Sequence, residues 1–424
     1  MASHIRQRWT AQFEGMGRRD RQGCNYDAYL PDPLAGWDLL MPADVAADLA
    51  DAENAVAGLN RAGTSHVSLE GLARFLLRAE SVGSSMIEGL VAATRRLVQA
   101  EVALARGDDA ADRVAVEVLG NIAAMEAAVE VATANDRFTL DDLLGIHRTL
   151  MDRSPTPQLG GVVRQAQNWI GGSSYNPCSA SFVPPPPDQV PGLLDDLVAY
   201  VNDDIHSPLA QAAIAHAQFE TIHPFADGNG RTGRALVHVV LRRRGLAPAF
   251  VPPISLVLAT WASTYVDGLM TYRHLDEFDS PERSSAAAEW LRLFATATHR
   301  ACIDAEHYAT RIDDLTATWR DRVGRVRADS GTDRLLSVLP GAPIIAVESA
   351  SELIGRSKAR TTDAVNALAE AGILRQRNVG RKRYRVFEAT DVLDLFTDLE
   401  RALASPTGDT LDARPARPAP GRRD

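Results

Sequence analysis

The chain is poor in lysine. Lysine and arginine together number 45 in 424 residues, yet only Lys358 and Lys382 are lysines, and no Gly-Lys-Ser/Thr sequence occurs. P-loop NTPases and protein kinases place a lysine on the phosphates of their nucleotide. Both lysines of this chain lie near its C-terminus, in a region we interpret below as a separate domain. We therefore exclude these two classes, and any nucleotide chemistry here must use arginine, backbone N–H groups and a metal ion.

Cysteines are few and long apolar runs are absent. Cys24, Cys178 and Cys302 are scattered and odd in number. They predict neither a disulfide framework nor a zinc site, and they favour a reducing, cytoplasmic compartment. The first eight residues lack the apolar core of a signal peptide. No run of about eighteen apolar residues exists, so we expect no membrane span. The net charge of −10 argues against a dedicated nucleic-acid binder, but it can hide a local basic patch.

The segment His-Pro-Phe-Ala-Asp-Gly-Asn-Gly-Arg-Thr-Gly-Arg at 223–234 concentrates chemical groups. Histidine is the side chain most easily poised as a general base near neutral pH. The Gly-Asn-Gly turn can point several N–H groups at one anion. The apolar run at 235–241 predicts a helix, whose N-terminus adds partial positive charge at the same place. Arg231 and Arg234 are one helical turn apart and share a face. The pattern predicts a polyphosphate held at a helix start, beside a base and a carboxylate placed to hold a metal.

These residues match the signature HPFx(D/E)GNGRxxR at every defined position, so the chain resembles the Fic family. The resemblance implies a mainly α fold, with a Fic helical core and a small β-hairpin flap. It implies a protein adenylyltransferase that moves AMP from ATP to a Ser, Thr or Tyr hydroxyl of a protein. His223 would be the catalytic base, and Asp227 would hold Mg²⁺. The ATP-binding residues implied are Gly228, Asn229, Gly230, Arg231 and Arg234.

A second stretch, Ser84-Ser-Met-Ile-Glu-Gly89, follows a predicted amphipathic helix. Taken alone, Glu88 would be a solvated helix carboxylate. Ser84, Glu88 and Gly89 resemble the autoinhibitory motif (S/T)xxxE(G/N) that many Fic proteins carry before the core. The resemblance implies that Glu88 pairs with Arg234 and obstructs the seat of the γ-phosphate, because one carboxylate occupies the guanidinium that would bind a phosphate oxygen.

Residues 159–172 carry β-branched residues between glycine pairs, which predicts a short hairpin. Fic proteins place their flap here, so the resemblance implies an edge that aligns the target backbone by strand addition. An ordinary surface hairpin is the alternative. The residues predicted to dock the target are Val163, Gln167, Trp169 and Ile170. Upstream, His147 lies on a predicted helix, and we expect it to be a packed or surface histidine.

The C-terminal region predicts helices at 333–339, 349–354 and 361–371, followed by two strands within 373–387. This order resembles a winged helix-turn-helix. Nine basic residues between 356 and 385 face only Asp363 and Glu370, which is the local charge that phosphate contact needs. The region is therefore a candidate DNA partner site at 356–385, although winged helices also dock proteins and form dimers, so a homodimer is an alternative.

The sequence thus predicts six parts. They are a flexible arm (1–25), an N-terminal helical region with the inhibitory motif (26–100), a Fic catalytic core (101–298), a connecting helix and linker (299–332), a winged-helix domain (333–403) and a disordered tail (404–424). The partners predicted are ATP, a protein target and the chain itself. Two alternatives stay open at this point. One is a DNA-binding regulator whose Fic core senses nucleotide without turnover. The other is a Fic enzyme that removes AMP or transfers UMP, phosphocholine or phosphate.

Overall fold

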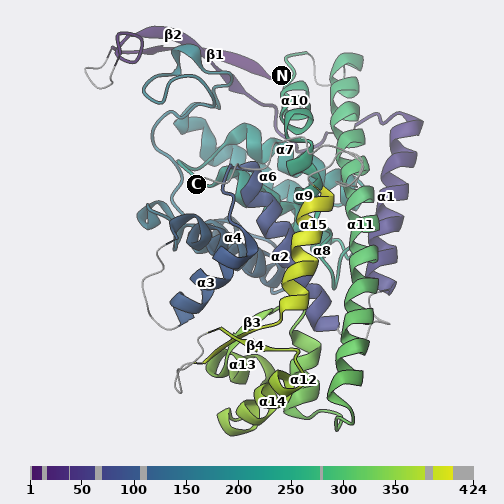
Figure 1. The fold of residues 1–424 in the computed structure, drawn as a ribbon. Coiled ribbons are helices and arrows are strands. Elements are labelled where there is room, and N and C mark those ends of the chain that lie inside the picture. The colour runs from purple at the N-terminus through teal and green to yellow at the C-terminus, as the bar shows by residue number, and fades with distance from the viewer. Residues whose placement is uncertain are drawn as a thin grey trace. The chain divides into compact units, whose positions relative to one another are not determined.

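The computed structural model describes residues 2–11, 17–37, 39–62, 69–105, 112–276, 280–377 and 385–403. The chain forms two compact units, each built from segments that are far apart in the sequence. The first comprises 1–51, 127–246 and 263–296, and the second comprises 52–126, 247–262 and 297–424. Helices dominate both units (Figure 1), so the predicted mainly α fold class is confirmed.

The helices and strands are bounded as follows. The helices are α1 Ala43–Ala62, α2 Leu69–Ile87, α3 Thr94–Ala105, α4 Arg113–Val131, α5 Leu140–Met151, α6 Val190–Val201, α7 Pro208–Ile222, α8 Asn229–Arg243, α9 Ile254–Thr260, α10 Ala262–Tyr272, α11 Pro281–Val323, α12 Gly331–Val338, α13 Val347–Ile354, α14 Lys358–Glu370 and α15 Thr390–Leu403. The strands are β1 Ser3–Trp9, β2 Cys24–Leu30, β3 Ile344–Ala346, β4 Arg375–Gln376 and β5 Val386–Glu388. The helix α11 is continuous across residues 298 and 299, where the sequence predicted a boundary.

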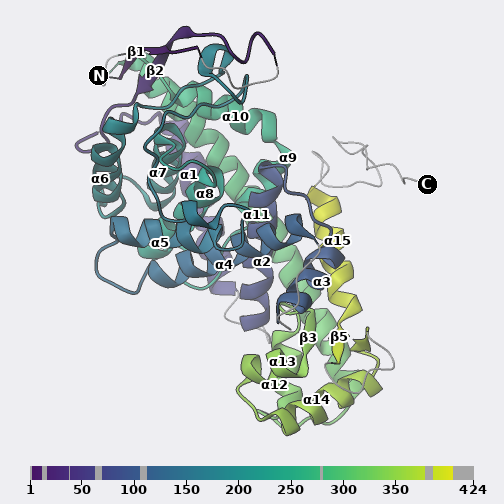
Figure 2. The same ribbon diagram turned by 90° about the vertical axis from the view of Figure 1, so that its left-hand side faces the viewer.

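The centre of the first unit is the helix pair α7 and α8, which a short loop joins. Every residue of α7 from Leu209 to Ile222 is buried. Its alanines let neighbouring helices approach closely, and α6 and α8 pack against it while α5 packs against α8 (Figure 2). Trp290 of α11 donates its indole N–H to the carbonyl of Ala213 at 2.9 Å. The turn of the signature motif therefore connects two buried helices, which fix its position.

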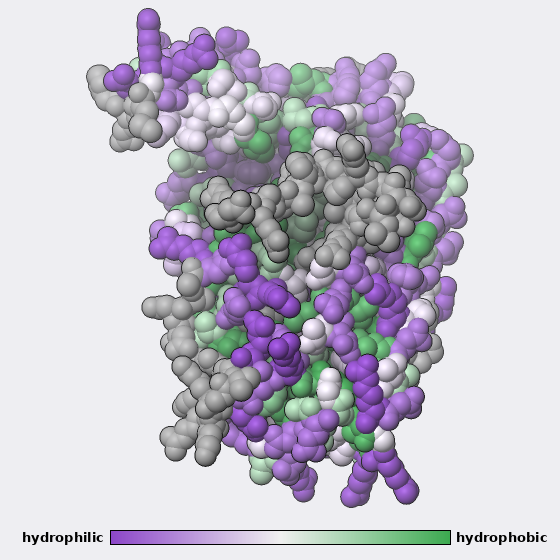
Figure 3. All heavy atoms as spheres, in the orientation of Figure 1, coloured by the Kyte–Doolittle hydropathy of each residue, from purple (hydrophilic) through white to green (hydrophobic). Residues whose placement is uncertain are grey.

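The N-terminal residues form a β-hairpin, so the predicted flexible arm is wrong for this part of the chain. Strand β1 pairs antiparallel with β2, from Ser3 opposite Leu30 to Trp9 opposite Cys24. Exposed residues alternate with half-buried Ile5, Gln7 and Trp9, a period of two that the arginines obscure in the sequence. The surface of the hairpin is mostly hydrophilic, in purple at the upper left of Figure 3.

A disulfide joins Cys24 of β2 to Cys178 across 154 residues, so the expectation of no disulfide is also wrong. The same region carries other contacts: Trp9 packs edge-on against Trp169 at 5.2 Å, and the amide of Asn176 donates to the carbonyl of Asp20 at 2.8 Å. Cysteine counting cannot reveal a pair so distant in sequence. The prediction of a reducing, cytoplasmic compartment rested on unpaired cysteines and loses that basis.

The second unit contains helix α2, which precedes the predicted inhibitory Glu88, and the C-terminal elements. Helix α2 packs on α9, where the buried carboxylate of Glu80 accepts the backbone N–H of Ser255 at 2.7 Å. Further along, α12, α13 and α14 group beside a three-stranded sheet of order β3-β5-β4 (Figures 1 and 2). The predicted helices and two strands are thus present, while the winged-helix assignment stays a prediction. The turn at 378–384 and the predicted disordered tail at 404–424 lie outside the described residues.

Among the residues that the structure describes, no helix is long and apolar enough to cross a membrane.

The disulfide generates a stability prediction. Replacing both partners, Cys24→Ser with Cys178→Ser, removes a crosslink that constrains the unfolded chain, so we expect the free energy of unfolding of the first unit to fall by about 2–4 kcal/mol. Urea unfolding followed by tryptophan fluorescence measures this. A dithiol reductant should lower the wild-type midpoint equally and leave the double variant unchanged. An unchanged wild-type midpoint, with two thiols titrated after reduction, would contradict the prediction.

Candidate active site

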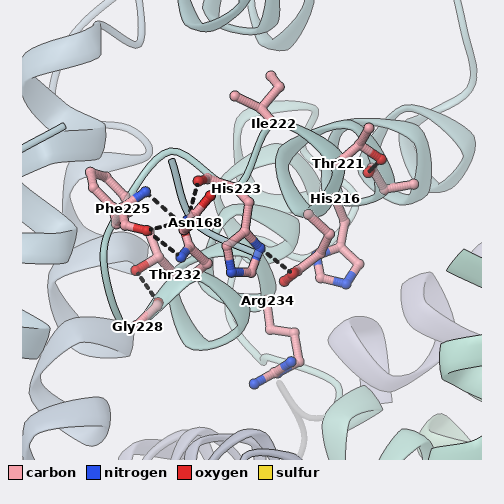
Figure 4. A network of polar contacts seen from close by, with 12 residues as sticks. Asn168, His216, Thr221, Ile222, His223, Phe225, Gly228, Thr232 and Arg234 are labelled. Atoms are coloured by element: carbon pink, nitrogen blue, oxygen red, sulfur yellow. Dashed lines mark hydrogen bonds and ion pairs between the residues drawn. The ribbon is translucent and has the colours of Figure 1, made fainter. Parts of the chain in front are cut away.

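The site is built on the turn that ends α7. His223 follows the last helical residue and adopts the left-handed conformation, with φ 48° and ψ 59°, while its N–H donates to the carbonyl of Phe219 at 2.9 Å. A non-glycine residue in this region is uncommon and costs free energy, so surrounding contacts must hold it. Figure 4 shows the imidazole with Arg234 beneath it and the loop of Phe225 and Gly228 to one side.

The loop between α7 and α8 is closed by the side chain of Asn229. Its Oδ1 accepts the N–H of Phe225 at 2.9 Å and its Nδ2 donates to the carbonyl of the same residue at 2.8 Å. Gly228 is left-handed (φ 77°), and a Cβ there would meet Leu150 at 3.0 Å, so both backbone and space require glycine. Both polar atoms of the Asn229 side chain thus stabilise the loop and bind its backbone. The part of this residue that we still predict to face phosphate is its backbone N–H.

The ring of His223 lies near a second carboxylate. Its Nδ1 is 3.8 Å from Oε2 of Glu220, one turn earlier on α7, and the contact is dashed in Figure 4. The histidine side chain is 20% exposed and that of Glu220 is buried. A carboxylate on the Nδ1 side favours a proton there, which leaves the Nε2 lone pair to accept a proton from a substrate. No local pattern in the sequence singles out Glu220.

The two arginines of the motif are buried on α8, as the predicted helix places them. Nη2 of Arg231 is 3.7 Å from Oδ1 of Asp227, but its Nε and Nη1 are buried without a hydrogen-bond partner among the described residues. Nη1 of Arg234 lies 3.5 Å from the hydroxyl of Tyr265. Buried donors without acceptors are costly, so the Arg231 guanidinium favours an anion at this point.

Asp227 is the candidate metal ligand. Its side chain is 55% exposed, and Oδ1 accepts the N–H of Gly228 at 2.6 Å. The described residues contain no group of three or more His, Cys, Asp or Glu side chains placed to hold a metal. A single carboxylate suits Mg²⁺, which takes its other ligands from water and substrate phosphates. The donor set therefore fits the predicted ion, and it does not fit an ion that needs an all-protein cage.

His147 is a positioning group whose role the sequence does not reveal. The ring is buried and stacks on Phe225, with centroids 3.6 Å apart. Nδ1 accepts the N–H of Gly161 at 2.9 Å, so Nε2 carries the proton and donates to the carbonyl of Asp227 at 3.0 Å. Burial lowers its pKa to about 4 and keeps it neutral. The predicted packed histidine thus joins α5, the predicted flap and the motif loop.

The predicted flap does not fold as a hairpin on itself. Its two ends pair elsewhere: Val163 bridges Phe225, and Ile170 bridges Phe182. Each end of the segment therefore pairs with a residue outside the segment. At the second bridge, the N–H of Ile170 donates to the carbonyl of Phe182 at 2.8 Å. We call residues 163–170 the strap, because they connect the motif loop to residue 182. This pairing corrects the hairpin prediction.

The strap contains all four residues predicted to dock the target, but two of their side chains donate hydrogen bonds to the chain's own backbone. Val163, Gln167, Trp169 and Ile170 are all half-buried. Gln167 donates to the carbonyl of Pro184 at 2.9 Å, and the indole N–H of Trp169 donates to the carbonyl of Ser173 at 2.7 Å. A target would therefore meet the strap backbone more than these polar groups.

The inhibitory motif forms the end of α2. Gly89 is left-handed (φ 78°), its N–H donates to the carbonyl of Met86 at 3.0 Å, and the N–H of Leu90 donates to that of Ser85 at 3.0 Å. This is a glycine-terminated helix end, with Glu88 directly before the glycine and Ser84 buried in the last turn. Glu88 and Arg234 belong to different units. Their pairing stays a prediction.

Two family models match segments of this chain. Residues 137–241 match the Fic/DOC family and residues 46–130 match the Fic/DOC family N-terminal region. The motif segment 223–234 lies inside the first match. The chain accordingly contains a Fic/DOC domain at 137–241, preceded by a Fic/DOC N-terminal region.

Its curated relatives are similar over part of their length. Protein adenylyltransferase fic-1 of Caenorhabditis elegans is 28% identical over 167 residues, which cover 39% of this chain and 31% of that protein. Protein adenylyltransferase Fic of Aedes aegypti is 35% identical over 139 residues, which cover 32% of this chain and 26% of that protein. The matched part thus spans under a third of these relatives. A solved Fic family protein from Desulfovibrio desulfuricans G20 is 19% identical, with a TM-score of 0.47, over 82% of this chain and 96% of that chain.

The neutral His147 generates a pH prediction. Its folded pKa of about 4 lies below the ordinary histidine value of 6.5, so the unfolded state binds more protons between these pH values. The contribution to stability is full above the unfolded pKa and is lost as pH falls towards 4. We expect this group alone to cost the first unit about 2 kcal/mol between pH 7 and pH 5.

Urea unfolding of wild type and His147→Gln at both pH values tests it. The variant should lose less stability than wild type on acidification. His216, whose pKa burial lowers to about 3, stays in both proteins and supplies a common background. Equal pH dependence in the two proteins would show that His147 is not the group responsible.

Proposed function

We propose that this protein is an adenylyltransferase that moves AMP from ATP to a hydroxyl group of a protein and is held inactive by Glu88. The observation that carries the proposal is the guanidinium of Arg231, whose buried Nε and Nη1 have no hydrogen-bond partner among the described residues. It lies at the start of α8, where a helix presents N–H groups to an anion. A polyphosphate could accept hydrogen bonds from both the Arg231 guanidinium and the helix N–H groups. His223 lies at the other end of the same loop.

The chemistry then follows from the chain's own groups. The target hydroxyl attacks the α-phosphorus of ATP, its proton passes to Nε2 of His223, and the bond to the β-phosphate oxygen breaks to release pyrophosphate. The N–H groups of Asn229 and Gly230 open α8 and would stabilise the growing charge on phosphate. The N–H of Gly228 already donates to the carboxylate of Asp227. Of the three residues predicted to bind phosphate through their N–H groups, we therefore propose only Asn229 and Gly230. Arg231 and Arg234 would bind the remaining phosphate oxygens.

The Asp227 carboxylate would hold Mg²⁺ against the phosphates, since one half-exposed carboxylate beside a phosphate site is the donor set this ion uses. When bound, the ion would neutralise phosphate charge as pyrophosphate departs.

Inhibition by Glu88 would follow from a competition for Arg234. A carboxylate that pairs with this buried guanidinium would take the place of a γ-phosphate oxygen. Helix α2 is anchored within its own unit by the buried Glu80, so the position of Glu88 at its end is well fixed there. Removing the Glu88 charge should therefore release the site without disturbing the anchor.

Intact-mass analysis with ATP and Mg²⁺ tests the function. Glu88→Gly should gain AMP on itself or on an added protein, and Glu88→Gln should behave alike, because the charge matters more than the backbone. Adding His223→Ala should lower the rate at least about 100-fold. His299→Ala, an exposed histidine on α11, is the matched control and should not change it. No labelling by either Glu88 variant, with folded protein, would refute the proposal.

The same measurement separates the other transfer reactions. Incubation with each nucleoside triphosphate in turn, and with a CDP-linked phosphocholine donor, shows which group adds to the protein mass. Loss of AMP mass from a previously labelled protein would instead identify AMP removal.

DNA binding is the second candidate function, and the order of α12–α14 and the sheet β3-β5-β4 favours it. Ion pairs weaken it: Arg356 binds Asp329 at 2.7 Å, and Arg377 lies 3.4 Å from the carboxylate of Glu388. Gel shifts of duplex DNA at several salt concentrations test it. Salt-sensitive binding that Arg360→Glu abolishes supports the candidate, and its absence eliminates it.

A further inference from the structure

One buried arginine of the strap holds three successive carbonyl groups around the candidate base. The Nε of Arg164 donates to the carbonyl of His223 at 2.9 Å, and its Nη2 donates to that of Ile222 at 3.3 Å. The backbone N–H of the same residue donates to the carbonyl of Pro224 at 2.9 Å. The side chain is almost fully buried and makes no ion pair with a carboxylate among the described residues. Its charge is matched by carbonyl groups alone.

The same guanidinium also binds one carbonyl within the strap and one in the segment that follows it. Nη1 donates to the carbonyl of Ala166 at 3.3 Å and Nη2 to that of Pro185 at 2.6 Å. Burial lowers the pKa of Arg164 to about 10, so the group stays charged at neutral pH. A charged group this deep is costly unless it is hydrogen-bonded, and here each of the three guanidinium nitrogens donates to a carbonyl group.

Its place at the end of α7 explains why the cost is tolerated. The last carbonyl groups of a helix lack intrahelical donors, and a cation there is favourable. Here the helix ends in the unfavourable left-handed conformation of His223. Hydrogen bonds to those carbonyl groups help to offset the free energy that this conformation costs. Asn168 adds a second donor to the His223 carbonyl at 3.2 Å and also donates to that of Phe225 at 3.1 Å. Strap and base are therefore one hydrogen-bonded assembly (Figure 4).

We propose that Arg164 is a positioning residue that fixes the backbone of His223 and couples the strap, where a target would lie, to the orientation of the base. This inference rests on the proposed transfer reaction for its consequence in catalysis, but the geometry it describes exists in the free protein. The strap would then both bind the target and orient the imidazole of His223 towards it. The test must separate this role from simple structural support.

The test compares Arg164→Met and Arg164→Lys in the Glu88→Gly protein, with Arg244→Lys as matched control. Arg244 donates to the carbonyl of His206 at 3.0 Å and to the side chain of Gln211, at the other end of α7. Arg164→Met should lower kcat about 10–100-fold and leave KM for ATP within about twofold, because base placement changes and phosphate binding does not. Arg164→Lys should restore part of kcat, since an ammonium cannot reproduce the planar fork. Arg244→Lys should match the parent.

A second readout needs no transfer activity. In protein labelled with ¹³C-histidine, the imidazole signal of His223, assigned by its loss in His223→Ala, should shift or broaden in Arg164→Met and stay unchanged in Arg244→Lys. A folded Arg164→Met protein with an unchanged His223 signal overturns the inference, as does an unchanged kcat. If the signal changes but no protein hydroxyl is ever modified, the transfer reaction is refuted and the positioning role stands. If Arg164→Met does not fold, the His223 imidazole signal is measured in Arg164→Lys and Asn168→Ala instead. An unchanged signal in both variants overturns the inference.

Discussion

The left-handed turn at His223 is the constraint on which the site depends. It ends α7 and directs the chain into the loop that leads to α8, so the candidate base and the start of the helix proposed to bind phosphate are separated by one short segment. The conformation is unfavourable in itself and is maintained by contacts from three directions. Asn229 closes the loop from α8, His147 supports it from α5, and Arg164 holds it from the strap. The catalytic geometry is therefore a tertiary property even though its residues are contiguous.

Buried positive charge is the second determinant of what the site can bind. The chain as a whole is acidic, with a net charge of −10, yet Arg231 and Arg234 are buried beside a helix N-terminus. Desolvated guanidinium groups interact strongly with anions because little water screens them. The site therefore discriminates by local charge and direction, and the average charge of the protein says little about it. His147 and His216 contribute no charge near neutral pH, since burial lowers their pKa values.

The N-terminal hairpin and the disulfide extend the support of the strap. Trp9 packs on Trp169, and the Cys24–Cys178 bond fixes β2 to the segment that follows the strap. Residues from the first thirty positions thus stabilise the edge at which a target would lie. This arrangement makes the strap a supported element, which suits a surface that aligns a backbone, because an edge must be rigid to define a register.

The local chemistry could be predicted from the sequence, because the motif residues at 223–234 are contiguous and the apolar run behind them has a helical period. The presence of a helix behind the motif and the shared face of Arg231 and Arg234 follow from the local helical period. The supporting contacts could not be predicted. His147 lies 80 residues from Asp227, Arg164 lies 59 from His223, and Cys24 lies 154 from Cys178. Such pairs leave no periodic signal, and the strap was mistaken for a hairpin because its edges pair with distant segments. The sequence by itself determined which groups are candidates for the chemistry, whereas only the tertiary structure decided what holds them in place, since hydrogen bonds between remote segments form only after the helices have packed.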